Sequence, residues 1–597
     1  MTTRSVELEQ PPTRAAGGTD AGGADGAAAD DRRDWPERWA AVRERVGPWL
    51  VPVLVGVMIL VPLGAVVRES AKESLPSLWD RATALPRIGE TLVNTVVMAA
   101  ASTALATVLG VVLAWFAVHL RGRRQRVATL VGIAPILVPG IAGATGWVFI
   151  FAPRIGYGNV LLRDLTGSDA VTGPVDVYSV LGIVVIVALY LVPYPMLFAL
   201  AALRKADPTL AKAAQVSGSS WLGAQFRVML PLLRPAIIYG AGVVLLLGLG
   251  QFVVVLILGR QEGIDVLTTE IYRHLEFYAG GVDYPLASFL GLPIIATALV
   301  MVVVQRWVIG DPLRYVSTSK GVGSAPREIR SGVFPLLGFG LVAVVPPLFG
   351  LTIVSLSKFW SADIAWGALN LDNYRELRDN EFFWPAITNS LRLALLATVI
   401  STLIAFALAL VIERRQRGPV RAVTEFVVQL PLSIPAVLFG LGILLTFGFT
   451  RFTFLGREVN LYGHAGLLVL AYVVLTLPQA VRNIQAGLAQ LDGSLESAAE
   501  VAGASRRRVY LDVTVPLIRQ SALSAAVMAF ILTSREFAAS VLLSTPQTQT
   551  MAPLLYNLYV TGTYPPVAAL AMVMVLISAI GVLLILVLGG RDALERM

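Results

Sequence analysis

DPTLAKAAQVSG, at residues 207–218, returns in altered form as DGSLESAAEVAG at residues 492–503, which is 285 positions later (492 − 207 = 285). Over the longer ranges 203–234 and 488–519, about 12 of 32 positions are identical. Roughly 3 identities would be expected by chance in a chain this rich in Ala, Leu and Val, so the two stretches are copies of an internal repeat.

Each copy predicts a short helix, a turn and a second short helix between two apolar runs. The aspartate suits the N-cap, the glycine suits a left-handed residue at the helix end, and the proline suits the first turn of the next helix. Two adjacent alanines leave a surface of low bulk on which another protein can sit closely. These positions are Asp207, Ala213, Ala214, Gly218 and Pro231 in the first copy, and Asp492, Ala498, Ala499, Gly503 and Pro516 in the second.

The spacing Ala-Ala-x3-Gly-x9-Val-x-(Leu/Val)-Pro resembles the EAA loop of ATP-binding-cassette (ABC) importer permeases, in the MetI-like type that fuses two six-helix halves in one chain. In that family the loop docks into the ATPase subunit, so the resemblance implies ATPase docking for the ten residues above. The usual glutamate of the motif is Lys212 in the first copy and Ser497 in the second, although Glu496 is adjacent. The resemblance therefore does not extend to a salt bridge by that glutamate. The alternative is a cytoplasmic helical hairpin without a partner.

Composition indicates a membrane protein. The 597 residues are 56% hydrophobic and 14% charged, with a mean hydropathy of +0.72. The sequence has no cysteine, which excludes a disulfide framework and a metal site built from thiolates. It has three histidines, which makes a metal site built from histidines improbable. The net charge of +8 lies in loops beside apolar runs, which indicates membrane topology rather than nucleic-acid binding.

Twelve apolar runs are each long enough to cross about 30 Å of hydrocarbon as a helix. The sequence therefore predicts an all-α polytopic membrane protein of about 12 transmembrane helices. The predicted spans are 49–67, 92–118, 127–151, 178–202, 235–258 and 286–308 in the first half, and 333–356, 387–411, 424–449, 463–482, 520–544 and 567–589 in the second.

The distribution of Arg and Lys sets the expected orientation. Placing both termini, both EAA loops, the turns 119–126 and 413–421 and the central linker in the cytoplasm puts about 32 of the 47 basic residues there. We therefore expect a multi-pass protein of the cytoplasmic (plasma) membrane of a prokaryote, with both termini cytoplasmic.

The two halves match outside the loops as well. Pro135-Ile-Leu-Val-Pro139 corresponds to Pro431-Leu-Ser-Ile-Pro435. Because each half begins on the same side, the halves are expected to be tandem parallel repeats around an axis along the membrane normal. The predicted parts are a disordered cytoplasmic tail (1–45), a first six-helix permease domain (46–309), a cytoplasmic linker (310–332) and a second six-helix permease domain (333–597).

Polar residues inside the predicted spans point to a translocation path. Arg535 and Glu536 lie within the span 520–544, and Gly250-Gln251 occupies the equivalent place in the first half. Neighbouring residues on a helix point about 100° apart, so Arg535 and Glu536 each need a partner of their own. Two interpretations stay open: these residues line the path, or they lock two helices together.

Related aromatic residues follow each of these spans. Tyr272 and Tyr556 lie in matching external segments, in the first half beside Glu270 and Glu276. Phenolic and carboxylate oxygens are suitable hard ligands for a ferric ion. The alternative is an interfacial aromatic belt with re-entrant helix packing. We predict no resident metal site and assign Gln251, Tyr272, Arg535, Glu536 and Tyr556 to the path.

No Gly-x4-Gly-Lys-Ser/Thr phosphate loop occurs, so the chain is not expected to be an enzyme or to hydrolyse ATP itself, and no cofactor is predicted. The resemblance implies two cytoplasmic ABC subunits and an extracytoplasmic solute-binding protein as partners, beside the lipid bilayer. The Arg-Glu-Phe segment at 535–537 looks most like ferric-iron permeases. Alternatives are thiamine, a phosphonate or another small solute, an ion-coupled secondary transporter, or a membrane-embedded enzyme.

Overall fold

The computed structural model describes residues 26–276, 281–309, 328–414, 418–448, 451–454 and 457–588. Its contacts divide the chain into two units, Met1–Leu50 and Val51–Met597. Helix α1 begins at Gly26, so the part of the predicted disordered tail from residue 26 to residue 45 is helical. The reason is that this stretch is rich in Ala and Arg, which favour helices. Residues 1–25 and most of the predicted linker lie outside the described residues.

The described part of the chain is almost entirely helical, with successive apolar helices joined by short turns. The helices of the first half are α1 (Gly26–Ser70), α2 (Leu75–Thr83), α3 (Ile88–Val118), α4 (Gly122–Ile133), α5 (Gly140–Phe151), α6 (Tyr157–Thr166), α7 (Val180–Leu191), α8 (Pro193–Lys205), α9 (Pro208–Val216), α10 (Trp221–Ala224), α11 (Leu230–Leu232), α12 (Arg234–Leu249), α13 (Val253–Leu258), α14 (Leu267–Arg273) and α15 (Tyr284–Ile309).

The second half repeats this order, with α18 in the place of α2. Where the first half has α6, the second half has a short antiparallel hairpin of β1 with β2, which was not predicted from the sequence. Its elements are α16 (Val333–Ala343), α17 (Val345–Leu356), α18 (Asp372–Asp379), α19 (Phe383–Arg414), α20 (Pro419–Ser433), α21 (Ala436–Ile443), β1 (Arg451–Phe454), β2 (Arg457–Asn460), α22 (Ala465–Leu488), α23 (Ser494–Val501), α24 (Arg506–Arg508), α25 (Val515–Ser534), α26 (Ser540–Leu543), α27 (Met551–Val560) and α28 (Tyr564–Leu588).

The predicted fold class is confirmed. By length and composition, eight helices in the described residues can cross a membrane, and the number rises to 12 if each of four bent helix pairs counts as one span. Two of these pairs bend sharply at equivalent prolines. The chain turns by 93° where Pro139 precedes α5 and by 103° where Pro435 precedes α21. Proline cannot continue the helical hydrogen-bond ladder, and the residue before it is biased to an extended conformation, which explains both bends.

Two predicted spans are shorter than expected. The span 235–258 is interrupted because α12 ends at Leu249, and the span 520–544 is interrupted because α25 ends at Ser534. Arg535 and Glu536 thus lie in a break between α25 and α26 rather than inside one helix. Their polar groups take partners outside the helical ladder, and Gly250 at the equivalent break is a poor helix former.

The first helix of each half packs against the other half. Gly146 on α5 approaches α17 so closely that an added Cβ would lie 2.5 Å from the carbonyl oxygen of Pro347. Gly442 on α21 approaches α1 in the same way, since a Cβ there would lie 2.5 Å from the carbonyl oxygen of Pro62. The same small-residue contact in both halves is typical of membrane helices that pack closely.

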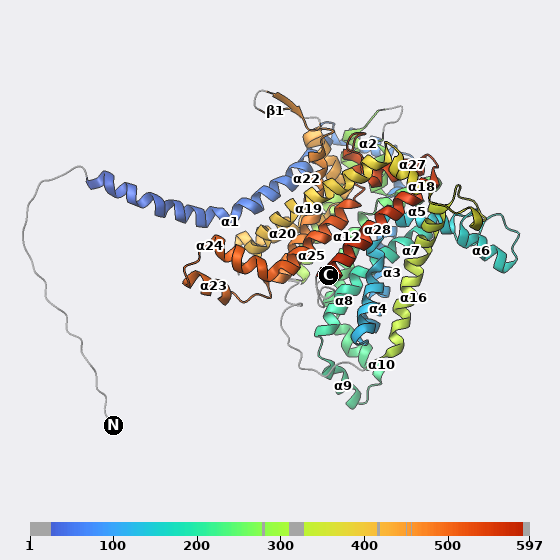
Figure 1. Cartoon of the computed structure of the whole chain (residues 1–597), viewed down its shortest axis with the longest axis horizontal. Coiled ribbons are helices and arrows are strands. Elements are labelled where there is room, and N and C mark those ends of the chain that lie inside the picture. Colours follow the sequence, from blue (N-terminus) through green and yellow to red (C-terminus); the bar gives the residue numbers. More distant parts are fainter. Residues whose placement is uncertain are drawn as a thin grey trace, which may run out of the picture. The chain divides into compact units, whose positions relative to one another are not determined.

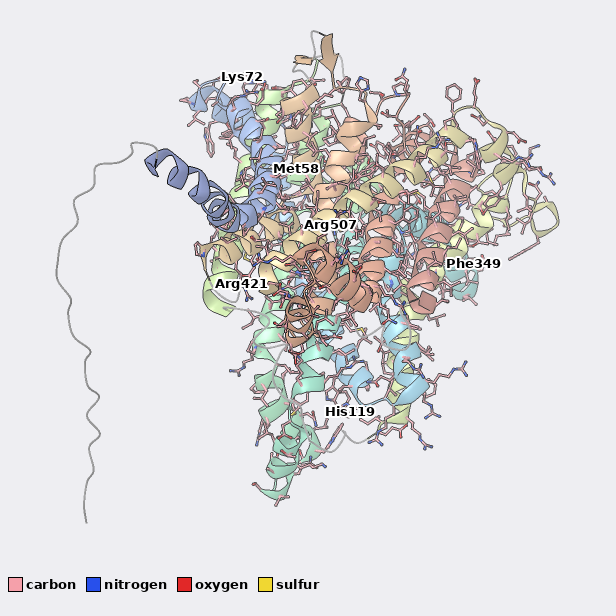
Figure 2. The ribbon with its side chains drawn as sticks, turned by 60° about the vertical axis from the view of Figure 1, so that its left-hand side comes forward. Met58, Lys72, His119, Phe349, Arg421 and Arg507 are labelled. Atoms are coloured by element: carbon pink, nitrogen blue, oxygen red, sulfur yellow. The ribbon has the colours of Figure 1, made fainter. Side chains whose placement is uncertain are left out.

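Within the unit Val51–Met597, the two repeated loops and the short helices α2, α18 and α27 lie on different sides of the membrane helices. Figure 1 shows α9 and α10 at the lower end, α23 and α24 at the left, and α2, α18 and α27 at the upper end. We call the side that carries α9, α10, α23 and α24 the loop end, and the side that carries α2, α18 and α27 the opposite end. Figure 2 shows His119, which follows α3, near the loop end and Lys72, which follows α1, at the opposite end.

We expect Gly146→Ala and Gly442→Ala to destabilise the protein, because the added methyl group meets backbone that cannot rotate away. Overpacking of this kind costs roughly 1–3 kcal/mol. The midpoint of thermal unfolding of the purified full chain in detergent measures the effect. Gly140→Ala on α5 is the matched control, since nothing lies within 4 Å of its added Cβ. Equal midpoints for all three variants would contradict the close approach.

Candidate functional site: paired loops and a central cavity

The first loop has the predicted capped geometry. Oδ1 of Asp207 accepts a hydrogen bond from the backbone N–H of Thr209 at 2.9 Å, which lowers the pKa of that carboxyl. Gly218 has a φ of +90°, and the N–H of Ser219 donates to the carbonyl oxygen of Ala214 at 2.9 Å. This is the left-handed glycine cap expected from the sequence, and a side chain at Gly218 would be strained.

The second loop repeats this geometry. Oδ1 of Asp492 accepts from the N–H of Ser494 at 3.0 Å, which lowers the pKa of Asp492. Gly503 has a φ of +87°, and the N–H of Ala504 donates to the carbonyl oxygen of Ala499 at 3.0 Å. One detail differs from the prediction: the residue directly before α23 is Gly493, so Asp492 binds from one position further back.

Both loops carry an exposed apolar tip. Val216 and Val501, at equivalent positions, are each 90% exposed. The alanine pairs lie on the same short helices, where Ala213 and Ala498 are exposed and Ala214 and Ala499 are half-buried. Pro516 lies in the first turn of the long helix α25, as predicted, whereas Pro231 lies in the three-residue helix α11 that precedes the long helix α12. A single exposed apolar side chain is ordinary on a protein surface, so the informative feature is that both loops carry one at the same position.

The two loops are held to their helices by different chemistry. In the second loop, Oε1 of Glu496 lies 2.5 Å from Nη2 of Arg414 at the end of α19 and accepts from Thr514 Oγ1 at 2.8 Å. In the first loop, the ring centroid of Trp221 lies 5.4 Å from that of Trp115 on α3, and Trp115 packs on His119 at 4.7 Å. Burial lowers the pKa of His119, so this anchor is neutral at neutral pH.

The sequence analysis left the role of Glu496 open, and the structure answers it in part. The residue adjacent to the family's usual glutamate position bonds within its own chain. The signal in the sequence was Arg414 in the basic segment 413–421, but nothing in the sequence linked the two residues. The position of Glu496 in the first loop is Ala211, which is buried in a small apolar cluster with Ala224 and Met229.

A cavity of about 420 Å³ lies between the two halves. It is lined at the bends before α5 and α21, at the ends of α12 and α25, and by α22. The predicted path residues Gln251, Arg535 and Glu536 all line it, as do Pro135 and Pro431. The structure therefore brings together three of the five predicted path residues with the prolines of both halves.

Arg535 and Glu536 have separate partners, as predicted. Nη1 of Arg535 donates to the carbonyl oxygen of Ile136 at 2.6 Å, which joins the second half to the first. The carboxylate of Glu536 accepts from the N–H of Ala539 at 2.8 Å and from the N–H and hydroxyl of Ser540 at 2.9 Å and 2.5 Å. Glu536 thus caps α26, while Arg535 bridges the two halves.

Tyr272 and Tyr556 do not line this cavity. They belong to a buried group of four rings, which we call the aromatic quartet: Phe252, Tyr272, Phe537 and Tyr556. Phe252 and Phe537 are stacked with centroids 5.6 Å apart, and Tyr272 and Tyr556 meet edge to face at 6.2 Å. Each phenylalanine also contacts the tyrosine of its own half, at 5.4 Å and 5.5 Å.

The aromatic quartet lies on the side of the cavity away from the loops. Helix α12 runs from the first loop to the cavity, and Phe252 follows its end; α25 and Phe537 have the same order. That Phe252 and Phe537 meet was not predicted, although each follows the polar step of its own half at the repeat offset. The repeat offset was the available signal, because residues on a two-fold axis meet their own equivalents.

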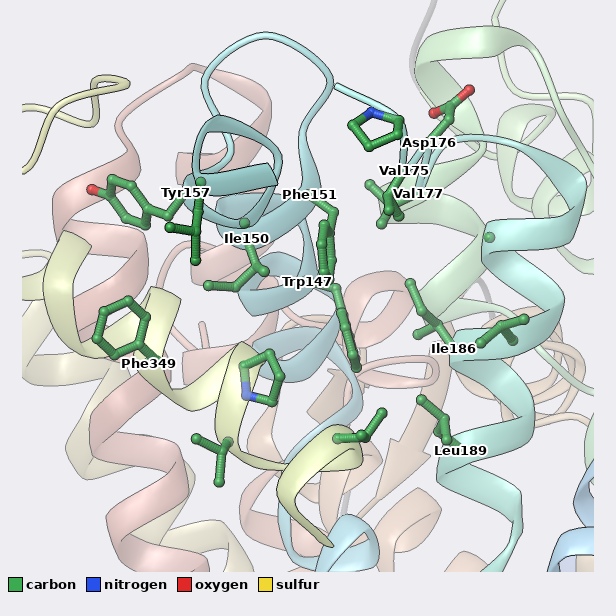
Figure 3. Close-up of a pocket in the computed structure, with 18 of the residues that line it drawn as sticks. Trp147, Ile150, Phe151, Tyr157, Val175, Asp176, Val177, Ile186, Leu189 and Phe349 are labelled. Atoms are coloured by element: carbon green, nitrogen blue, oxygen red, sulfur yellow. The ribbon is translucent and has the colours of Figure 1, made fainter. Parts of the chain in front are cut away.

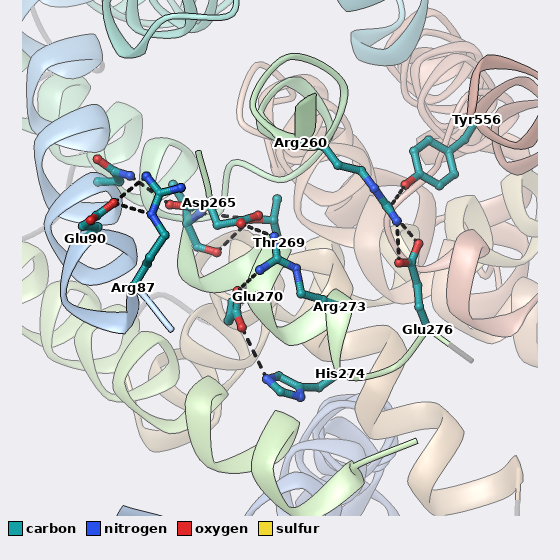
Figure 4. Close-up of polar contacts among 12 residues, drawn as sticks. Arg87, Glu90, Arg260, Asp265, Thr269, Glu270, Arg273, His274, Glu276 and Tyr556 are labelled. Carbon is teal, nitrogen blue, oxygen red and sulfur yellow. Dashed lines mark hydrogen bonds and ion pairs between the residues drawn. The ribbon is translucent and has the colours of Figure 1, made fainter. Parts of the chain in front are cut away.

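The acidic residues near Tyr272 form ion pairs rather than a ligand set (Figure 4). Arg260 pairs with Glu276 at 2.9 Å and donates to Tyr556 Oη, and Arg273 pairs with Asp265 and Glu270. In the described residues no group of three His, Asp or Glu side chains is placed to hold a metal ion. The suggestion that these oxygens bind ferric iron is therefore not supported by their geometry.

A second, larger hollow of about 900 Å³ is apolar (Figure 3). It lies between α5, α7 and α17, where Trp147, Leu189 and Phe349 face it, with Asp176 near its upper rim. None of the predicted path residues lines it. Its lining matches a surface that contacts acyl chains rather than a polar solute.

Comparison with known proteins identifies the family. The model of the family described as "Binding-protein-dependent transport system inner membrane component" matches residues 106–310 and again residues 397–591. The "Ferric transport system permease protein FbpB" of Actinobacillus pleuropneumoniae is 25% identical over 488 residues, which are 79% of this chain and 67% of that protein. The "Putative ferric transport system permease protein FbpB 1" of Haemophilus influenzae is 24% identical, covering 74% of this chain and 68% of that protein.

A shorter relative matches one half. The "Molybdenum transport system permease protein ModB" of Escherichia coli (strain K12) is 32% identical over 215 residues, which are 34% of this chain and 91% of that protein. The two family matches cover more than half of the chain and confirm the resemblance stated from the sequence. The chain therefore belongs to the family of inner membrane components of binding-protein-dependent transport systems, as a fused permease that carries the family's domain twice.

Proposed function

We propose that this permease imports a small solute that an external binding protein delivers, driven by two separate ATPase subunits that dock on the paired loops. The observation that carries the proposal is the pair of loops with the same cap, the same left-handed glycine and the same exposed valine. Two equal docking surfaces match a pair of identical or homologous ATPases. A secondary transporter driven by an ion gradient has no need for such a pair.

Each docking surface consists of a low-bulk alanine pair and an exposed valine tip. In the first loop it comprises Asp207, Ala213, Ala214, Gly218 and Pro231, and in the second Asp492, Ala498, Ala499, Gly503 and Pro516. Asp207 and Asp492 hold the helix starts and the glycines hold the helix ends, so the alanine face is presented in one orientation. Val216 and Val501 supply apolar area that a groove on the ATPase would bury.

The translocation path runs through the central cavity, past Gln251, Arg535 and Glu536, to the aromatic quartet. In this conformation the quartet forms the closure on the side away from the loops. Nucleotide-driven approach of the two ATPases would draw the loops together, tilt the two halves and separate Phe252 from Phe537. Tyr272 and Tyr556 belong to this closure. This is alternating access between two packings of the same helices.

Ferric iron is the solute that we infer for the importer, supported by the similarity to the two ferric transport permeases over most of the chain. Thiamine, a phosphonate or another small solute remains the alternative within the same importer class. Selection of the solute would rest with the binding protein. ATP hydrolysis would occur in the partner subunits, since the sequence carries no phosphate loop.

The membrane arrangement follows from the same proposal. The two permease domains span 46–309 and 333–597 and are joined by a linker at 310–332. The loop end faces the cytoplasm, supported by the excess of Arg and Lys there, and both termini lie on that side. The tail at 1–45 would then also be cytoplasmic.

Replacing Gly218 or Gly503 by valine should weaken coupling strongly while the protein still inserts. A β-branched residue is strained at a φ near +90°, so the turn after the short helix must reorganise at a cost of roughly 1–2 kcal/mol. Solute-stimulated ATP hydrolysis by the reconstituted complex should fall about tenfold, the change that 1.4 kcal/mol produces. Gly89→Val, at an open position with ordinary φ on α3, is the control. Unchanged uptake in the Gly218 and Gly503 variants would refute the docking assignment.

Arg414→Ala should weaken coupling through the second loop only, because Glu496 loses a charged partner worth about 1.5–3 kcal/mol. The exchanged pair, Arg414→Glu with Glu496→Arg, should recover much of the lost ATPase stimulation and uptake. Arg378→Ala, in an exposed ion pair with Asp379, serves as the control. If the exchanged pair is no better than the single variants, the ion pair does not hold the loop.

Phe252→Ala combined with Phe537→Ala should open the closure formed by the aromatic quartet. Proteoliposomes that contain the permease should then leak a small hydrophilic solute without ATP, at a rate well above that of the wild type. Phe359→Ala, at an aromatic side chain that is 72% exposed, is the control. If the double variant is folded and its proteoliposomes leak no faster than those of the wild type, the quartet is a packing contact and not a closure.

A further inference from the structure

The charge balance of the central cavity is uneven. Among the described residues that line it, Arg535 and Glu536 are the only charged side chains. The remaining polar groups are neutral, including Tyr190, Gln251 and Gln479. Whether the cavity attracts an anion or a cation therefore depends on how the charge of each of these two residues is already compensated.

Glu536 is fully engaged. One carboxylate oxygen accepts from the N–H of Ala539, and the other accepts from both the N–H and the hydroxyl of Ser540. Three donors at the start of α26 thus compensate its negative charge. Three of the roughly four acceptor sites of the carboxylate are thus taken, which leaves little capacity for binding a cation in the cavity.

Arg535 is much less engaged. Its Nη1 donates to the carbonyl oxygen of Ile136, which is a neutral acceptor. No carboxylate in the described part of the chain lies within the 4.0 Å of an ion pair with Arg535. A guanidinium has five N–H donors, so this one contact leaves both charge and hydrogen-bonding capacity toward the cavity. A positive charge in a wall of low dielectric attracts anions and repels cations.

We propose that the solute crosses this cavity as an anion, either an oxyanion or a metal held in an anionic chelate, and that Arg535 binds it. The inference rests on the proposed function and narrows its substrate class. It excludes thiamine, which is a cation. It is compatible with ferric iron only when the iron travels with acidic oxygen ligands, and this fits the lack of a protein ligand set among the described residues.

Binding would also act on the contact between the halves. An anion that takes the donors of Arg535 competes with the carbonyl oxygen of Ile136, which belongs to the turn before the bend at Pro139. The solute would thereby weaken the one hydrogen bond by which Arg535 joins α25 to the first half.

The absence of cysteine from the sequence allows a direct test of the cavity's potential without any ATPase. Gln479→Cys or Gln251→Cys places one thiol in the lining, and Ser168→Cys places one on an exposed loop as the control. The purified full-length protein is labelled with an anionic and a cationic methanethiosulfonate of similar size. The quantity measured is the ratio of the anionic to the cationic labelling rate.

We expect this ratio in the cavity to be about tenfold higher than at Ser168→Cys, which corresponds to about 1.4 kcal/mol. The ratio should fall to the control value in the Arg535→Gln variant. It should stay high in the Arg535→Lys variant, because lysine keeps the positive charge without the guanidinium. Thermal unfolding midpoints establish that the variants are folded. Faster labelling by the cationic reagent, or a ratio that Arg535→Gln leaves unchanged, would overturn the proposal.

Protection of the cavity thiol then distinguishes the two kinds of anion. Molybdate as the protecting solute would indicate an oxyanion, and ferric citrate that protects more than citrate alone would indicate a chelate. Protection by thiamine but by neither anion would overturn the proposal, as would protection by none of the three. These labelling ratios are measured without the ATPase subunits, so they do not depend on ATPase docking. The anion proposal can therefore be overturned without affecting the proposed importer function, and the reverse also holds.

Discussion

The close backbone contact between each half and the first helix of the other half is the constraint on which the rest of the structure depends. Gly146 approaches the backbone of Pro347 and Gly442 approaches the backbone of Pro62, and an added Cβ would lie 2.5 Å from the proline carbonyl oxygen in both cases. Each half therefore makes the same close contact with the first helix of the other half. This arrangement keeps the bends before α5 and α21 facing one another, and the cavity between them is a consequence of that packing.

The second recurring feature is that the chain is irregular where the halves meet. The bends at Pro139 and Pro435 and the breaks after α12 and α25 free backbone groups and side chains from the helices. Irregular backbone at membrane depth is tolerated where it is buried in protein or lines a cavity. Here it forms the cavity wall, carries Arg535 and Glu536, and ends in the aromatic quartet. The proposed path and its proposed closure therefore both consist of these interruptions.

Much of this could be predicted from the sequence because the information is local or repeated. The caps at Asp207 and Asp492, the left-handed glycines and the twelve apolar spans follow from neighbouring residues, and the EAA spacing led to the family. The aromatic quartet, the pairing of Arg414 with Glu496 and the exchange of first helices join residues far apart in the sequence. Single-sequence patterns do not report such contacts. The helix break at Arg535 was also missed, because an apolar run shows its length but not where the backbone leaves the helix.

The two loops have the same exposed tip but are held to the membrane helices by different contacts. Tryptophan packing holds the first loop and an ion pair holds the second. Equal tips suit the proposed docking of two like ATPase subunits. The central claim is that these loops convert nucleotide binding into motion of the halves. The distance between spin labels at Lys212→Cys and Ser497→Cys in the assembled complex tests it most directly. The account predicts that the distance shortens when ATP binds and recovers after hydrolysis, and a distance that does not respond to nucleotide would contradict it.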